Sequence, residues 1–144
     1  MITVKQNFLD ETFIHNFIQN IIKESQEYKP IWKSNINWGE NIVKGSSLVL
    51  AYEIKKEELN YIKSKFIELD NKFKDKEIVG PIYLNKYWEI DWGGLYIWKE
   101  DNKLNIEKPE FNKLIINKGN TKHGTTLLNY NIPEERLTLQ IFFK

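Results

Sequence analysis

The chain has 144 residues, with 21 basic and 20 acidic side chains and a formal net charge of +1. This length favours a single domain with its own hydrophobic core, and the balanced charge excludes a bulk attraction to nucleic acid or to an anionic membrane. The sequence contains no cysteine, which excludes disulfides, thiolate metal sites and cysteine nucleophiles. Because no apolar run has the length of a membrane span and the first residues lack the features of a signal peptide, we expect a cytoplasmic protein.

The N-terminal part, residues 1–75, is predicted to contain two amphipathic helices. Asp10 is a suitable N-cap for a helix that the pattern extends to about Glu24. A loop is expected over residues 26–46, a short apolar strand over residues 47–52, and a second helix over residues 54–73. Apolar residues spaced three and four apart predict one buried stripe on each helix: Phe13, Ile14, Phe17, Ile18, Ile21 and Ile22 on the first, and Leu59, Ile62, Phe66, Leu69 and Phe73 on the second.

The C-terminal part, residues 76–144, is predicted to consist of short strands separated by turns. After the Gly93-Gly94 break, Leu95 and Ile97 alternate with two aromatic residues, which is the period of a strand. In the last strand Arg136 and Thr138 are predicted to face the side opposite to the leucines between and after them. Strands at this spacing, with Gly, Asn and Pro between them, favour a sandwich or a jelly-roll barrel.

Four short motifs follow one another in this part. They are Leu84-Asn85 with Trp88 and then Trp92-Gly93-Gly94-Leu95; Pro109-x-x-Asn112-x-Leu114; His123-Gly124; and Arg136-x-Thr138. In this order they resemble the second half of the 2-oxoglutarate/Fe(II)-dependent oxygenases, specifically the prolyl-hydroxylase-like group. The resemblance implies one α+β, mainly β domain over residues 1–144. Its core would be a shortened double-stranded β-helix of the jelly-roll, cupin-like type, with the two N-terminal helices packed on one sheet.

The resemblance also implies a site. His123 corresponds to the distal histidine ligand of Fe(II), and Arg136 to the residue that pairs with the distal carboxylate of 2-oxoglutarate, with Thr138 adding a hydroxyl on the same strand face. Arg136 is the only arginine among 21 basic residues. A guanidinium can bind a carboxylate through two parallel hydrogen bonds, which lysine cannot do. Chance use of one arginine in a lysine-rich chain is the alternative explanation.

The first half of the iron site is missing from the sequence. The family places His-x-Asp or His-x-Glu before the Leu-Asn strand, but this chain has two histidines and no such triplet. Glu68-Leu69-Asp70 lies near the expected distance upstream, which makes Glu68 and Asp70 the candidate replacements for these ligands. Glu89-Ile90-Asp91 is a second triplet of this kind. Ordinary surface charge is the alternative for both triplets.

Three functions are therefore open at this stage. The first is a hydroxylase that uses Fe(II) and 2-oxoglutarate to modify a peptide prolyl residue or a small molecule. The second is a catalytically inactive β-helix domain that binds a carboxylate ligand or a protein partner. The third is a structural subunit that forms a homodimer through an exposed strand edge.

Overall fold

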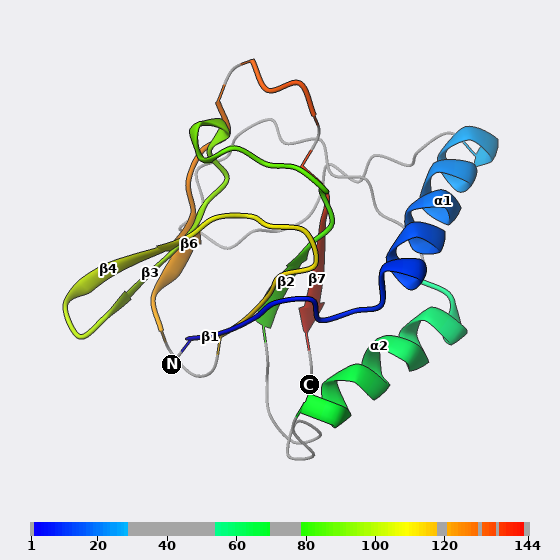
Figure 1. Cartoon of the computed structure of the whole chain (residues 1–144), viewed down its shortest axis with the longest axis horizontal. Helices are drawn as coiled ribbons and strands as arrows, with labels where there is room; N and C mark the ends of the chain where they lie inside the picture. The colour runs from blue at the N-terminus through cyan, green and yellow to red at the C-terminus, as the bar shows by residue number, and fades with distance from the viewer. Residues whose placement is uncertain are drawn as a thin grey trace.

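The computed structural model describes residues 2–28, 54–69, 79–117, 121–129, 131–134 and 136–142 (Figure 1). These residues form two α-helices, seven strands and a short 3-10 turn. The helices are α1 (Glu11–Tyr28) and α2 (Lys56–Leu69), and the 3-10 turn η2 spans Ile90–Trp92. The strands are β1 (Ile2–Lys5), β2 (Val79–Tyr83), β3 (Tyr96–Glu100), β4 (Lys103–Glu107), β5 (Leu114–Asn117), β6 (His123–Thr125) and β7 (Thr138–Phe142).

The strands form two antiparallel sheets. The larger sheet has the order β1-β5-β2-β7, and the smaller one has the order β4-β3-β6. Figure 1 shows both helices on one side of the larger sheet and the smaller sheet on its other side. The larger sheet is therefore the central layer, and its two faces have different neighbours.

Alternation along the strands produces two separate apolar clusters. Ile82, Leu114 and Ile116 point to the helices and pack with the buried faces of α1 and α2. Tyr83 and Ile115, the intervening residues, point the other way and pack with Tyr96 of the smaller sheet. Because neighbouring residues of a strand face opposite sides, one face of the larger sheet holds the helices and the other holds the smaller sheet.

Several sequence predictions can be compared with these elements. Both helices exist, although α1 extends beyond the predicted end at Glu24 and α2 is described only as far as Leu69. Strands β3 and β4 form a hairpin, with Asp101 and Asn102 at φ of 50° and 60° in its turn. The predicted strand over residues 47–52 and the second-helix residue Phe73 lie outside the described residues. No helix in the described ranges is long and apolar enough to cross a membrane.

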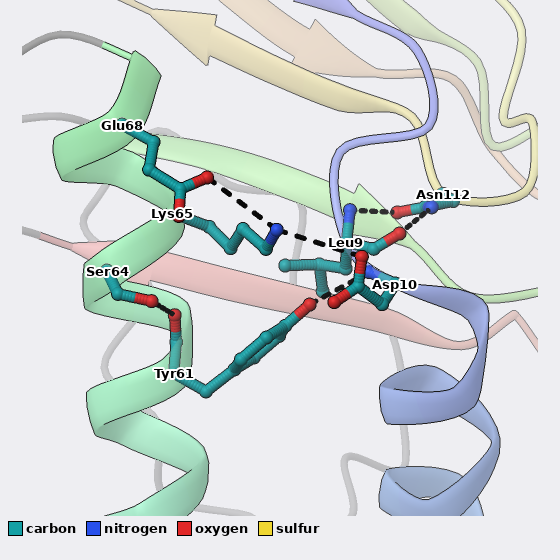
Figure 2. Close-up of polar contacts among 7 residues, drawn as sticks. All are labelled: Leu9, Asp10, Tyr61, Ser64, Lys65, Glu68 and Asn112. Carbon is teal, nitrogen blue, oxygen red and sulfur yellow. Dashed lines mark hydrogen bonds and ion pairs between the residues drawn. The ribbon is translucent and has the colours of Figure 1, made fainter.

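A polar clamp fixes the start of α1 (Figure 2). Asn112, which is 1% exposed, accepts a hydrogen bond from the Leu9 N–H at 2.7 Å and donates one to the Leu9 carbonyl. The Asp10 N–H donates to the Tyr61 hydroxyl at 2.9 Å, and Lys65 lies 3.7 Å from the Asp10 carboxylate. These contacts join Leu9 to the turn before β5, and they join Asp10, the residue before α1, to α2.

We expect Asn112→Ala to lower the free energy of unfolding by about 3 kcal/mol, because it leaves two buried Leu9 backbone groups without partners. The alanine would also occupy the left-handed φ of 59° that Asn112 tolerates. Chemical denaturation measures this loss. Asn112→Gly removes the strain but not the unpaired groups, so it should lose most of the same free energy. Asn105→Ala, a control at a half-buried position on β4, should change stability by less than about 0.5 kcal/mol, and an equal effect of both alanines would contradict the clamp.

Candidate functional site

Arg136 and Thr138 lie on the face of the larger sheet that is turned away from the helices. Thr138 is directly across from Tyr83 in the β2–β7 pair, while Leu139 packs into the helix-side cluster. Arg136 precedes Thr138 by two residues and therefore shares its face. Its Nη1 donates to the Gly94 carbonyl, two residues before β3, at 3.3 Å. The arginine thus reaches from the larger sheet to the smaller one.

Burial shifts the pKa values of Arg136 and of its neighbour Tyr83. Desolvation lowers the pKa of the Arg136 guanidinium, although an arginine keeps its charge at neutral pH. Burial raises the pKa of the Tyr83 phenol well above its ordinary value, and the positive charge of Arg136 opposes that rise. Within the described part of the chain no carboxylate forms an ion pair with Arg136. The guanidinium is therefore a largely buried cation whose hydrogen-bond partner there is one backbone carbonyl.

Gly94 makes room for this arginine. A Cβ at Gly94 would lie 3.2 Å from Cδ of Arg136 and 2.8 Å from Cδ2 of Leu128. The residue also has a φ of +66°, which side chains rarely adopt. The second glycine of the Trp-Gly-Gly motif thus permits the close approach of Arg136 to the smaller sheet.

The Thr138 hydroxyl is also buried, and it has no hydrogen-bond partner among the described residues. Thr138 additionally lines a pocket of about 540 Å³ between α1 and β7. A second pocket, of about 520 Å³, lies by Trp88 and Pro109. Arg136 lines neither of these two pockets, and the residue as a whole is partly exposed.

His123 lies on β6, directly across from Trp98 of β3, so both residues face the larger sheet. Its ring stacks on Tyr96, with ring centroids 5.6 Å apart. Nδ1 lies 2.9 Å from the Thr121 carbonyl and 2.6 Å from Nδ2 of Asn117. The Nδ2 group of Asn117 is a donor, so it donates to an unprotonated Nδ1 and the ring proton is then on Nε2. The opposite tautomer, in which Nδ1–H donates to the Thr121 carbonyl and Nε2 is free to bind a metal, requires the Asn117 amide to be turned so that its Oδ1 accepts.

Among the described residues, the other candidate iron ligands do not join His123 in a cluster. Glu68 lies on α2, on the helix side of the larger sheet, with its carboxylate 3.6 Å from Lys65 (Figure 2). Asp70 lies outside the described residues. Glu89 contacts the Tyr87 hydroxyl, and Asp91 is exposed on η2. Across the described ranges, no three His, Cys, Asp or Glu side chains stand close enough to hold a metal ion. The iron ligands His123, Glu68 and Asp70 therefore stay a prediction.

Two residues of this region were not predicted as site residues. Tyr83 supplies a buried phenol beside Arg136, and Trp98 supplies a buried indole N–H. Period-two alternation along the strand predicts that the Tyr83 side chain faces away from Ile82 and Leu84, and this alternation is the sequence feature that could have placed Tyr83 at the site. The sequence carried no comparable sign that the Trp98 indole would lack an acceptor.

Comparisons with known proteins give the fold. No family model matches the chain, and no curated protein matches it. The crystal structure of a Pseudomonas putida prolyl-4-hydroxylase is similar over 99% of this chain and 92% of that one, with a TM-score of 0.67 and 13% identity. A Trichoplax adhaerens prolyl hydroxylase, in complex with a hypoxia inducible factor oxygen degradation domain peptide fragment, is similar over 99% and 82%, with a TM-score of 0.64 and 13% identity. The chain therefore has a mixed fold of two helices and antiparallel sheets that is related to the fold of the prolyl hydroxylases.

Proposed function

We propose that this chain binds a carboxylate-bearing small molecule on the inner face of its larger sheet, with Arg136 as the anchor. The observation that carries the proposal is the largely buried guanidinium of Arg136, which forms no ion pair with a carboxylate in the described part of the chain. We also infer that the two antiparallel sheets are the shortened jelly-roll core that the motifs indicate.

The energetic reason is the cost of an unpaired charge. Moving a charged group out of water is unfavourable unless an opposite charge and hydrogen bonds compensate for it. Arginine offers five N–H donors in a planar fork, and the Gly94 carbonyl uses one of its nitrogens. A bound carboxylate would supply the missing negative charge and accept two parallel hydrogen bonds.

Two neighbours complete the carboxylate site. The Thr138 hydroxyl, buried and unpartnered among the described residues, can donate to a carboxylate oxygen. The raised pKa of Tyr83 keeps its phenol protonated at neutral pH, so Tyr83 is also a donor. The ligand that the motif resemblance implies is 2-oxoglutarate, with its distal carboxylate against Arg136.

A second candidate function is the hydroxylation of a peptide prolyl residue or a small molecule with Fe(II) and 2-oxoglutarate. The observation in its favour is His123, which is solvent-exposed and whose Nδ1 faces the Thr121 carbonyl. Two further ligands are needed, and the described residues do not provide them beside His123. Carboxylate binding is therefore the function that the geometry supports better.

Isothermal titration of the full chain with 2-oxoglutarate separates the two functions. In the presence of EDTA we expect saturable binding, whereas the neutral dimethyl ester of glutarate should not bind. Repeating the titration with Mn(II) in place of EDTA should leave the affinity unchanged. A gain of tenfold or more with Mn(II) would favour the hydroxylase, since the co-substrate would then chelate the metal. If 2-oxoglutarate binds under neither condition, both functions are wrong.

A further inference from the structure

Strand β4 is an edge strand of the smaller sheet. It pairs with β3 on one side, and no described strand pairs with its other side. Figure 1 shows the β3–β4 hairpin projecting from the larger sheet, on the side away from both helices. Leu104 and Ile106 are 66% and 54% exposed on the outer face of this hairpin, where they lie across from Lys99 and Ile97. An exposed strand edge with apolar side chains is a template for pairing with another strand.

The unused backbone groups of this edge belong to Leu104 and Ile106. The Lys99 N–H donates to the Lys122 carbonyl at 3.0 Å, on the β6 side of β3. In an antiparallel pair, opposite residues that do not bond each other direct their backbone groups to opposite sides. Leu104, the partner of Lys99 on β4, therefore points away from β3, and so does Ile106 two residues later. Outside the β3–β4 pair, no described residue bonds to the backbone of either one.

The five residues of β4, Lys103–Glu107, are complementary to themselves in the antiparallel direction. In a two-fold pair centred on Asn105, Leu104 of one copy lies opposite Ile106 of the other copy, so apolar side chains meet on the outer face. On the inner face, Lys103 of one copy lies opposite Glu107 of the other copy, so opposite charges meet. A shift by one residue would turn the apolar face of one strand to the polar face of the other.

Both charged residues are able to form this pair. Lys103 is exposed and forms no ion pair within the described ranges. Glu107 binds Lys113 through Oε2 at 2.9 Å, which leaves Oε1 for a second cation. The charge pattern of β4 therefore favours a second copy of the same strand over an arbitrary partner.

We propose that β4 is the contact surface for a second copy of this chain, through the antiparallel pairing of Lys103–Glu107 with itself. The outward groups of Leu104 and Ile106 form four backbone hydrogen bonds across the two-fold axis, and the two three-stranded sheets become one six-stranded sheet. Because the pairing involves one short strand from each copy, the interface is smaller than that of a stable complex, and the expected dissociation constant is about 100 µM. This surface is independent of the proposed carboxylate site.

The test uses the absence of cysteine from the chain. Asn105→Cys introduces one thiol, and the two-fold pair places the two thiols opposite each other, with Cα atoms about 4.5 Å apart, which suits a disulfide. Leu127→Cys is the control, because Leu127 is 87% exposed and lies outside β4. In glutathione buffer we expect Asn105→Cys to form a covalent dimer about tenfold faster or more, since pairing raises the effective thiol concentration. Equal rates would indicate random collision and overturn the proposal.

Sedimentation of the wild-type chain from about 10 µM to about 1 mM gives the second measurement. The weight-average mass should rise above the monomer value of 17.3 kDa. Ile106→Pro removes an outward N–H and spares the bonds to β3, so it should keep the wild-type circular dichroism and stay monomeric.

Lys103→Glu is the second variant, and it does not depend on the tolerance of β4 for proline. It places like charges opposite each other, so it should weaken the dimer by about fivefold at low salt and by less at high salt. A wild-type chain that stays at 17.3 kDa throughout overturns the proposal, and a strand of another protein is then the remaining occupant of the edge. A dimer that both variants leave unchanged overturns it as well.

Discussion

Replacement of Arg136 by methionine should abolish 2-oxoglutarate binding while leaving the unliganded protein as stable as the wild type or more so. Loss of the buried guanidinium removes the anchor, and the expected affinity falls by about a hundredfold or more. The same change removes a charge that no described carboxylate neutralises, and well-packed apolar replacements of buried charges are often neutral or stabilising. The affinity of Arg136→Lys for 2-oxoglutarate should lie between the affinities of the wild type and of Arg136→Met, because an ammonium keeps the charge but not the bidentate geometry.

Denaturant unfolding with and without 2-oxoglutarate measures both effects in one series, since a ligand of the native state raises its stability by mass action. Lys99→Met is the matched control: it makes the same change in charge on an exposed residue of β3 and should alter neither quantity. A large loss of stability in unliganded Arg136→Met, with ligand binding retained, would show that Arg136 serves the fold instead of a ligand.

The second large effect concerns a buried lysine. Lys113, the residue before β5, is 1% exposed, and its Nζ donates to Glu107, to Glu110 and to the Lys108 carbonyl, each at 2.9 Å. An ammonium has three donors, so all of them are used. The two carboxylates are themselves partly exposed, at 29% and 49%. The buried charge of Lys113 is thus stabilised by these three acceptors, whereas the two carboxylates are also in contact with water.

We expect the double variant Glu107→Ala/Glu110→Ala to lose about 3 to 5 kcal/mol of unfolding free energy, because it strands the Lys113 charge beside a single carbonyl. Adding Lys113→Met to that variant should restore much of the loss, since the charge is then gone as well. Chemical denaturation of the three proteins gives the comparison. The exposed acids Glu57 and Asp91, each replaced by alanine, should change stability by less than about 0.5 kcal/mol per site. If the triple variant is less stable than the double variant, the account of the lysine is wrong.

The fold could be predicted where the pattern is local. Apolar residues at helical spacing predicted α1 and α2, because a helix must bury one stripe. Alternation predicted that Leu139 and Thr138 would face opposite sides of β7, as they do. Lys113 could not be predicted in this way. Its burial depends on carboxylates that the β4–β5 connection brings together, and a lysine in a sequence ordinarily indicates an exposed position.

The site could be predicted only in part, for a similar reason. Arg136 and Thr138 came from a motif and from a count of arginines, and the structure places both on one sheet face. Tyr83 joins them through the pairing of β2 with β7, two strands that are distant in the chain, and no local pattern indicates this pairing. Glu68 shows the opposite case. Its sequence distance from the Leu-Asn strand suited an iron ligand, but a helix places it on the far side of the larger sheet, beside Lys65.

The most direct test uses the fact that Arg136 is the only arginine in the chain. After labelling with ¹⁵N-arginine, the protein has one side-chain Nε–Hε signal in its NMR spectrum, and that signal needs no assignment. Titration with 2-oxoglutarate in EDTA should move it progressively to a saturating position, with the neutral dimethyl ester of glutarate as the control. If the signal stays in place while the ligand is shown by calorimetry to bind, Arg136 is not the carboxylate anchor.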